Sequence, residues 1–558
     1  MTDRHAASDT DSDPTPPPAS RRVSRRSMLS AAGIGVGTLA ISGGGAVVGS
    51  RRDRRGDRNL ESGGNPAPGT GGDAGGVDAG ADGQLDQFSR MFDVDRFAEP
   101  SEELTAALTE LGRRGGPMDA NDPLDVGPVR LLTEPEFSVG NPNNPTHTAG
   151  VTFVGQFLDH DLTRDAGSTL NQPTGLGRSM NLRTARFDLD SVYGGGPREM
   201  PALYEAGDQF RFRVESGGVF EDLPRDLDGH AVLGDNRNDE NMMISGLHCA
   251  FLLAHNEALD RARAVGLDGE EAFNEARRQL RWHYQWLILN EWLPQFVGQE
   301  LVDDVRANGR RFYTDQRPRI PVEFQTAAYR FGHSMVRPSY RANLAGDDGE
   351  PFFGFVFSPD DVDAGDPDDP DHLVGGHRAP RRFIGWQTFF DFGDGEARPN
   401  KRIDTALSTP LFQLPIFAIG SDRAEDAGPL SLATRNLLRH TTWRLPSGQR
   451  LATIMGEPVI GAVDLPDLEG LGAGLQESTP LWYYILREAE LIADGLHLGP
   501  VGGRIVAEVF VGLLELDPTS YLQANDWRPT WPVDDSDTGF RTTDLLRMAG
   551  VDPDRRGQ

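Results

Sequence analysis

The sequence predicts an all-α fold: one large, mainly helical domain with few short strands. Apolar residues recur at helical spacing through most of the chain, and the alternating runs that indicate strands are brief. A long candidate helix covers 270–297, and apolar segments at 481–486 and 505–510 predict further helices. Helices with apolar faces bury them against one another, so we expect these segments to enclose one core.

The first 84 residues differ in composition from the rest of the chain. Residues 24–29 read SRRSML and precede an uncharged, glycine-rich apolar run at 31–48, which is typical of a twin-arginine export signal. This run is too short and too rich in glycine to predict a transmembrane helix, although an uncleaved signal anchor stays open. Apolar residues nearly vanish at 51–84, as in a disordered linker. We expect a signal region at 1–50, this linker, and an exported protein that is extracellular or in the cell envelope.

Charge and cysteine content narrow the function classes. The formal net charge is -30, and Lys401 is the one lysine among the basic residues. No basic stripe exists to neutralise phosphates, so nucleic acid is excluded as a partner. The acidity fits a saline habitat or base composition equally, and the acidic run Asp360–Asp371 reads as a solvated insertion rather than a calcium loop. The single cysteine, Cys249, permits no intrachain disulfide and is expected to be buried and inert.

The segment 153–163, which reads FVGQFLDHDLT, gives the strongest indication of a site. Gln156 and His160 are four residues apart and project together from one face of the predicted helix, and Asp159 and Asp161 flank the histidine. Burying such groups without partners costs about 2 kcal/mol or more for each group. We therefore expect a cation, a metal or a cofactor beside this helix.

A second segment, 184–194, reads TARFDLDSVYG and offers oxygen ligands. Thr184, Asp188 and Asp190 alternate along it, and the carbonyl of Arg186 is also available. Such a set suits a hard cation, because calcium takes about six to eight oxygen ligands. Taken alone, the segment is better interpreted as a solvated acidic turn, since turns rich in aspartate are common.

A third segment, 234–241, reads GDNRNDEN and precedes an apolar run at 243–254, so it predicts the start of a helix. Asp235 and Asn238 are candidate caps of that helix, which would leave Arg237 as an exposed charge. A site role for Arg237 and Glu240 is the alternative.

A fourth segment, 329–338, reads YRFGHSMVRP and carries His333, and the runs NLLR and LPSG follow at 436–439 and 445–448. A lone histidine on an apolar helix is more often a core residue than a ligand, as we expect for His248, His255 and His283. His333 stands apart only because of its place in the larger pattern.

In their order and spacing these segments resemble the animal-type haem peroxidases of the peroxidase–cyclooxygenase superfamily, whose distal motif reads Gln-x-x-Asp-His-Asp-x-Thr. Few cysteines mark this chain as similar to a compact bacterial or archaeal member. The matched segments run from about 152 to 448 and would share one cofactor, so we expect one peroxidase domain at 85–550. The resemblance implies catalytic roles for His160 as acid and base, Arg237 as the distal arginine and Gln156 as a halide-positioning residue.

The resemblance also implies a cofactor derived from haem b. His333 would be the axial ligand of its iron, and Asn436 would accept the other ring N–H of that histidine. The remaining residues that would bind the cofactor are Asp159 and Glu240, through ester links to haem methyl groups, together with Arg330 and Arg439. No sulfonium link is expected, because Asn241 rather than methionine follows Glu240 and Met242 comes one residue later.

One Ca²⁺ is implied as well. Asp161 of the distal helix would join Thr184, Arg186, Asp188 and Asp190 in holding it. Vertebrate members usually carry serine at the place of Asp190, so this site would be more anionic, and tighter binding or a different ion both stay open.

The implied activity is that of a haem peroxidase. It would reduce hydrogen peroxide through a ferryl intermediate and oxidise small organic donors or anions, with bromide, iodide and thiocyanate preferred to chloride. A fatty-acid dioxygenase or cyclooxygenase is less favoured, because Arg330 stands where such enzymes carry tyrosine and Tyr329 is expected to lie on the wrong side. A non-catalytic, calcium-dependent adhesion protein on the same scaffold is the alternative of another class. The reducing substrate and the oligomeric state are not encoded in any motif, and no membrane partner is expected unless the signal is retained.

Overall fold

The computed structural model describes residues 86–165, 167–216, 220–346, 349–357, 372–376, 382–419, 428–524, 526–532 and 539–556. The expected signal region, the linker and the acidic run Asp360–Asp371 lie outside these residues, so those three interpretations stay predictions. All described residues belong to one compact unit. Across the described ranges, every helix is too short or too polar to span a bilayer.

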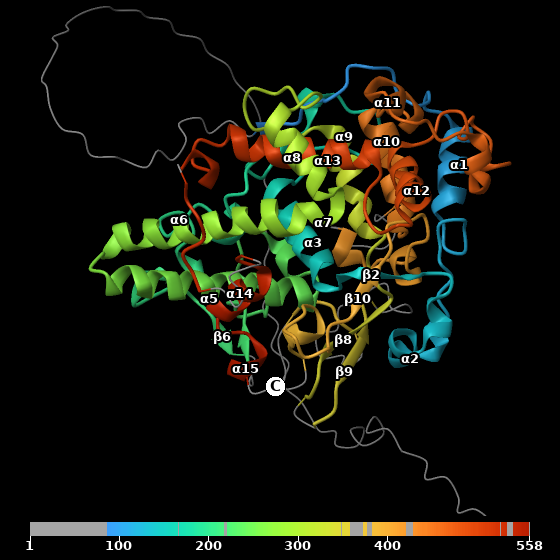
Figure 1. The fold of residues 1–558 in the computed structure, drawn as a ribbon. Coiled ribbons are helices and arrows are strands. Elements are labelled where there is room, and N and C mark those ends of the chain that lie inside the picture. Colours follow the sequence, from blue (N-terminus) through green and yellow to red (C-terminus); the bar gives the residue numbers. More distant parts are fainter. Residues whose placement is uncertain are drawn as a thin grey trace, which may run out of the picture. The chain divides into compact units, whose positions relative to one another are not determined.

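Helices make up about half of the described residues and strands are few and short, which confirms the predicted mainly helical fold (Figure 1). In chain order they are α1 (Glu102–Gly112), α2 (Pro128–Thr133), α3 (Gly150–Leu162), α4 (Asp190–Tyr193), α5 (Met242–Ala264), α6 (Gly269–Leu287), α7 (Leu293–Val297), α8 (Gln299–Asn308), α9 (Val322–Thr326), α10 (Leu432–Trp443), α11 (Gly448–Met455), α12 (Leu481–Ala493), α13 (Pro500–Leu516), α14 (Thr542–Met548) and α15 (Pro553–Arg556). Among several short 3₁₀ segments, η6 (Asn236–Asp239) and η8 (Ala328–His333) matter for the site.

The strands among the described residues are short and antiparallel, and each sheet holds two of them. The pairs are β1 (Asp86–Gln87) with β3 (Met180–Asn181), β2 (Asn143–Thr148) with β10 (Pro399–Lys401), β4 (Tyr204–Glu205) with β5 (Asp208–Phe212), β6 (Glu215–Ser216) with β7 (Glu221–Asp222), and β8 (Ser339–Asn343) with β9 (Phe352–Phe355). These two-stranded sheets are separate from one another and build no continuous layer.

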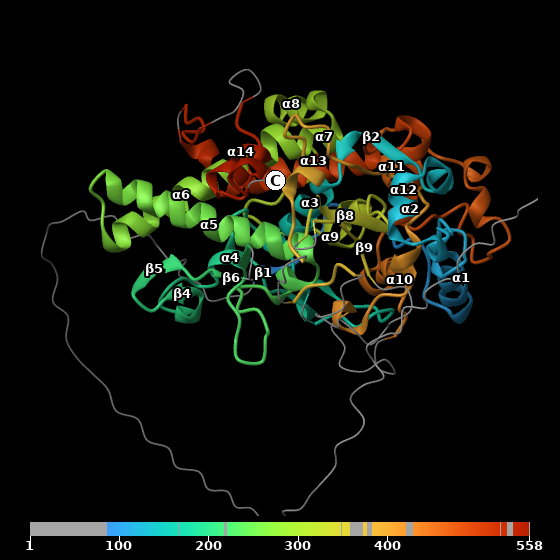
Figure 2. The same cartoon turned by 90° about the horizontal axis from the view of Figure 1, so that it is seen from below.

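Helices α5 and α6 form an antiparallel pair that runs side by side in both views (Figure 2). Their connection turns at Gly266, whose φ of 96° suits glycine, and Asp268 then caps α6. The predicted long helix is confirmed, because α6, a π-helical turn at Ile288–Trp292 and α7 follow one another without a break. The π turn changes the helical register and brings Trp292 into the wall of the cavity described below.

Helix α3 lies at the centre and contacts α5, η6 and η8. Its Gly155 allows close approach, since a Cβ there would lie 3.1 Å from the ring of Trp292. The apolar segments at 481–486 and 505–510 lie in α12 and α13, which contact each other and η8, as the sequence predicted. Cys249 is buried within α5, also as predicted.

Candidate functional site

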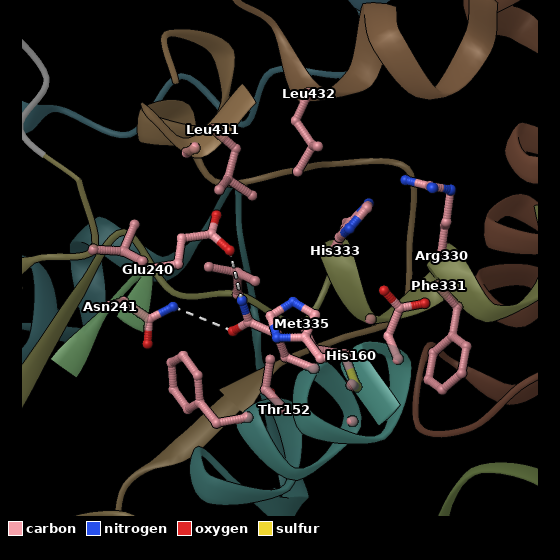
Figure 3. A pocket seen from close by; sticks show the side chains of 18 of the residues that line it. Thr152, His160, Glu240, Asn241, Arg330, Phe331, His333, Met335, Leu411 and Leu432 are labelled. Carbon is pink, nitrogen blue, oxygen red and sulfur yellow. Dashed lines mark hydrogen bonds between the residues drawn. The ribbon is translucent and has the colours of Figure 1, made fainter. Parts of the chain in front are cut away.

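A cavity lies between α3 and η8 (Figure 3). Gln156, Asp159 and His160 line it from α3, Glu240 and Asn241 line it from the start of α5, and residues 329–333 of η8 line it from the opposite side. Most of the remaining wall is apolar, from Phe153, Trp292, Met335, Val336, Val356, Phe357, Leu411, Leu414, Ala418 and Leu432. Segments almost three hundred residues apart in sequence therefore share one mixed polar and apolar chamber.

His160 is buried and its ring is oriented by an amide. Its Nδ1 lies 2.8 Å from Oδ1 of Asn238, whose Nδ2 lies 2.9 Å from Nδ1 of His248. The Asn238 oxygen can only accept, so Nδ1 of His160 carries the proton and Nε2 keeps its lone pair. Burial, and then the nearby charge of Arg237, lower the pKa of His160 to about 4. At neutral pH the ring is a neutral base that faces the cavity.

Arg237 lies behind Asp159 rather than in the cavity lining. Its Nη2 donates to the carbonyls of His160 at 3.2 Å and Thr163 at 2.7 Å, and to Oδ2 of Asp235 at 2.9 Å. Nη1 approaches Oδ2 of Asp159 at 3.7 Å. The reading of Arg237 as an exposed charge is wrong, since only 27% of its side chain is exposed. It stiffens the end of α3 and places positive charge next to a cavity carboxylate.

Asp235 organises this cationic group. It accepts from the backbone N–H of Arg237 as the cap of η6, and it also lies within 3.5 Å of Arg164 and Arg183. Burial opposes its ionisation, but the hydrogen bonds and charge of Arg237 hold the pKa of Asp235 below its ordinary value. The sequence correctly predicted a capping role for Asp235, but α5 itself begins under a different cap, Asn241.

Three side chains beside the cavity form a chain of hydrogen bonds. Asn241 Nδ2 donates to Oε1 of Gln156 at 3.2 Å, and Gln156 Nε2 donates to Oε2 of Glu240 at 3.1 Å (Figure 3). Burial raises the pKa of Glu240 to about 7, with Arg237 opposing the rise and Asp159 adding to it. The amide of Gln156 therefore has a fixed direction between an amide and a carboxyl group.

On the opposite side, His333 lies at the end of η8 and makes one side-chain hydrogen bond among the described residues. Its Nδ1 lies 2.7 Å from Nδ2 of Asn436 in α10, and Oδ1 of Asn436 accepts from Nη1 of Arg330 at 3.1 Å. The expectation that Asn436 accepts from His333 is not met in this arrangement, because Arg330 already occupies the amide oxygen. Burial, then Arg330 and Arg439, lower the pKa of His333 to about 3.

Two arginines lie on the η8 side of the cavity. Arg330 lines the cavity, and burial followed by the charge of Arg439 lowers its pKa to about 9. Arg439 lies outside the lining and reaches Oδ2 of Asp165 at 3.5 Å. The two arginines that the resemblance assigned to cofactor binding thus lie near each other and near His333, and one of them faces the cavity.

The structure brings together the three acidic residues among the five expected calcium ligands. Carboxylate oxygens of Asp161, Asp188 and Asp190 lie within 4.8 Å of one another. Thr184 joins them, since its Oγ1 donates to Asp188 at 2.8 Å and its backbone N–H donates to Asp190 at 3.0 Å. Arg186, whose carbonyl is the fifth expected ligand, lies on the same loop. This loop is therefore more than an isolated acidic turn.

Asp161 is the buried member of this cluster. It accepts from the backbone of Leu189 at 3.1 Å and from the hydroxyls of Ser191 and Tyr284 at 3.2 Å each. Burial, then the charges of Asp190 and Asp188, raise the pKa of Asp161 well above its ordinary value. Burial and Asp188 likewise raise the pKa of Asp190 to about 7. A bound cation would relieve this repulsion, and Asp161 is the direct neighbour of His160 in α3.

Tyr329 corrects another expectation. It lines the cavity, and its hydroxyl donates to the carbonyl of Gly155 in α3 at 2.9 Å. The 3₁₀ geometry of η8 places it there, because that turn is tighter than the α-helix assumed from sequence.

Several residues of the site carry no signal of their own in the sequence. Asn238 was visible only as a candidate cap, yet it connects His160 to His248. His248, like His255 and His283, is buried as expected. Tyr284 and Trp292 read simply as apolar helix residues. They reach the site because Tyr284 of α6 and Trp292 of the π-helical turn each donate a hydrogen bond to α3.

Part of the chain matches a known protein family. Residues 164–352 match the family model described as "Animal haem peroxidase". This stretch contains the acidic loop, Arg237, Glu240 and His333, whereas α3 precedes it and Asn436 follows it.

Curated relatives match over a similar length. Peroxidasin homolog pxn-2 of Caenorhabditis elegans is 28% identical over 177 residues, which is 28% of this chain and 13% of that protein. Chorion peroxidase of Aedes aegypti is 30% identical over 189 residues, 30% of this chain and 23% of that protein. Human thyroid peroxidase is 26% identical over 188 residues, 29% of this chain and 20% of that protein. The matched part of the chain thus spans less than a quarter of each of these relatives.

Solved structures share the fold over a greater length. Peroxidase A from Dictyostelium discoideum has a TM-score of 0.56 at 16% identity, and covers 83% of this chain and 93% of that one. The fatty acid alpha-dioxygenase of Oryza sativa has a TM-score of 0.50 at 13% identity, with 84% and 79% covered. These two likenesses concern the fold alone.

Proposed function

We propose that this chain, which belongs to the animal haem peroxidase family, binds haem between His160 and His333 and reduces hydrogen peroxide while it oxidises a small anion or organic donor. The observation that carries the proposal is that two buried, neutral histidines line one cavity of mixed polar and apolar lining from opposite sides. The histidines come from α3 and η8, which are the two segments that the resemblance singled out.

The residues present fit a haem group. An apolar wall suits a flat, apolar macrocycle, and a buried imidazole whose pKa is low stays neutral and keeps a lone pair for iron. His333 is the proposed ligand, since Arg330 and Arg439 beside it supply positive charge for acidic groups of the cofactor. When bound, haem supplies a redox-active iron that exchanges electrons with peroxide and with the donor.

One rearrangement is required at Asn436. A ligand nitrogen at Nε2 leaves the proton of His333 on Nδ1, so Asn436 must then present its oxygen to that atom. Rotating the amide by a half turn achieves this and releases Arg330 from the amide oxygen. Arg330 would then donate to a carboxylate of the cofactor.

On the α3 side His160 handles the proton. With haem bound, its Nε2 would accept a proton from one oxygen of peroxide and donate it to the other oxygen, while the electrons for cleavage of the O–O bond would come from the cofactor. Asn238 holds the ring in the required tautomer. General acid and base help of this kind contributes about 10²- to 10⁴-fold. Arg237 adds positive charge behind Asp159 and lowers the proton affinity of His160.

Asp159 and Glu240 are the proposed sites of ester links to the cofactor, and both line the cavity. Gln156 is the proposed contact for halide or thiocyanate. Asn241 follows Glu240, so we propose no sulfonium link and a preference for bromide, iodide or thiocyanate over chloride. The acidic cluster beside α3 is the proposed Ca²⁺ site.

The absorption spectrum of the purified, haem-supplied protein tests the proposal. We expect a Soret band that shifts when one equivalent of hydrogen peroxide is added, followed by its return when bromide, iodide or a phenol is supplied. Absence of the band, or a band indifferent to peroxide, would reject the proposal and leave adhesion as the leading interpretation of this scaffold.

The position of Tyr329 favours a second function, fatty-acid oxygenation, because a tyrosine in the cavity wall can form the radical that such chemistry needs. Oxygen uptake with linoleate separates the two functions. Uptake that Tyr329→Phe abolishes would favour the oxygenase, and peroxide turnover that survives this substitution would favour the peroxidase.

A further inference from the structure

We infer that Asn241 fixes the direction of the Gln156 amide, so that Gln156 offers an N–H group to a small monovalent anion in the cavity. The inference rests on the proposed function and deepens it, because it identifies a positioning residue for the anionic substrate. It begins from the three-residue hydrogen-bond chain beside Glu240 (Figure 3).

The donor and acceptor roles in these hydrogen bonds follow from the backbone N–H of Ile244. The backbone N–H of Ile244 can only donate, and it lies 2.9 Å from Oδ1 of Asn241, the cap of α5. The other amide atom of Asn241, its Nδ2, must therefore face Gln156, and the atom it meets at 3.2 Å must be an acceptor, Oε1. Gln156 Nε2 is then left for Glu240. The cap of α5 thus determines which group donates and which accepts in each of these hydrogen bonds.

A half turn of the Gln156 amide breaks both of its contacts. It would bring Nε2 against Nδ2 of Asn241, two donors, and Oε1 against Oε2 of Glu240, two oxygens. The observed direction is therefore the stable one as long as Asn241 presents its nitrogen.

Asn241 has little freedom to adapt. Its backbone bridges to Val374, and the neighbouring residues are held by Met242 N to Leu373 O at 2.8 Å and Gly375 N to Glu240 O at 3.1 Å. Gly375 permits this approach, since a Cβ there would meet the carbonyl oxygen of Asp239 at 1.6 Å. Both the side chain of Asn241 and the backbone on either side of it are therefore held by hydrogen bonds.

The fixed direction matters for an anion. An amide nitrogen carries two N–H groups, and among the described residues Glu240 accepts from Gln156 Nε2 through one of them. The second remains for a ligand in the cavity, which Gln156 lines together with His160. Asp159 and Glu240 line it too, so an amide that turned its oxygen inward would add a further repulsive group. Anion binding should therefore depend strongly on Asn241.

Bromide affinity measured by absorption titration of the haem-loaded, ferric protein tests the inference without relying on turnover. Asn241→Asp keeps the acceptor that caps α5 but replaces the donor to Gln156 by an oxygen, which favours the reversed amide. We expect its dissociation constant for bromide to rise about tenfold or more, the order expected when a hydrogen bond to a charged group is lost.

The added negative charge alone would also weaken bromide binding, so a double-mutant cycle with Gln156→Leu separates the two effects. If Asn241 acts through the amide, its substitution should cost at least about fivefold less in the Gln156→Leu background than in the parent. Equal costs in the two backgrounds would overturn the inference. Asn308→Asp, at the exposed end of α8, makes the same chemical change far from the cavity and should leave bromide affinity unchanged.

Two further outcomes are distinguishable. A parent protein whose Soret band responds to peroxide but which binds no bromide would overturn the inference and leave the proposed peroxidase standing. A parent protein without a Soret band would reject the proposed function, and the inference with it.

Discussion

The two sides of the cavity each hold a neutral histidine, but the charged groups around the two rings differ. His160 on α3 lies among carboxylates, and Asp159 and Asp235 partly offset the burial and the Arg237 charge that lower its pKa to about 4. At His333 on η8, the effect of burial is increased by the charges of Arg330 and Arg439, and the pKa of this histidine falls to about 3. Both rings are neutral at neutral pH, but the carboxylates near His160 favour its uptake of a proton, whereas the arginines near His333 oppose it and suit metal ligation.

The hydrogen bonds of the two histidine rings differ as well. Nδ1 of His160 faces an amide oxygen and Nδ1 of His333 faces an amide nitrogen, so the two rings hold opposite tautomers. The α3 side is already arranged for its proposed chemistry. The η8 side needs the Asn436 rotation before His333 can bind iron through Nε2.

The largest effect is expected on the η8 side, for His333→Ala. Loss of the proposed axial ligand should abolish the Soret band of protein supplied with haem, while far-ultraviolet circular dichroism stays unchanged. His230→Ala replaces an exposed histidine and serves as the control that should keep the band. A His333→Ala protein that retains a full Soret band would show that the iron is held elsewhere, or that ester links alone retain the cofactor.

The second largest effect is expected for His160→Ala, on the α3 side of the cavity. The protein should keep its haem, because the substituted residue lies opposite the proposed ligand, but the rate of its reaction with peroxide should fall about 10²- to 10⁴-fold. Stopped-flow absorption measures that rate directly. A fall of less than tenfold would mean that another group moves the proton and that the proposed division of labour between the two sides is wrong.

The sequence predicted the elements that bear the site better than the contacts within it. Helix α3 and the continuous helix through 269–297 follow from local patterns of spacing and residue type. The proximity of Asp161 to Asp188 and Asp190 was implied only by the family resemblance. The contact between Asn238 and His160 spans 78 residues along the chain, and the one between Asn436 and His333 spans 103. No local pattern encodes which amide atom faces which ring nitrogen, because competing partners such as Arg330 decide it. The position of Arg237 behind Asp159 likewise depends on the folded chain, because Nη2 donates to the carbonyls of His160 and Thr163, which are 77 and 74 residues away in sequence.

Removal of calcium should affect the two sides unequally. Asp161 precedes the end of α3 next to His160, so chelation should slow the peroxide reaction more than it lowers haem retention. Thermal unfolding should show a stability loss of about 2.7 kcal/mol if free Ca²⁺ initially exceeds its dissociation constant about 100-fold. Asp188→Asn should make the protein insensitive to chelator, whereas Asp228→Asn, in an exposed acidic cluster, should not. Equal unfolding temperatures for the parent with chelator and with added Ca²⁺ would reject a bound ion.

The smallest effect is the dependence of folding stability on pH, which compares the two histidines in the haem-free protein. Both have a pKa below the ordinary value of 6.5, so each binds fewer protons folded than unfolded, and its contribution is complete above pH 6.5 and is lost as the pH falls. The loss should end near pH 4 for His160 but continue to about pH 3 for His333. Glu240 acts in the opposite sense, because its pKa is raised to about 7, so the histidine contributions must be isolated by difference. Subtracting the profile of His160→Gln or His333→Gln from that of the parent should remove a slope of about 1.4 kcal/mol per pH unit in each window. If the two difference profiles end at the same pH, the contrast between carboxylate and arginine surroundings does not govern proton affinity, and burial alone sets both values.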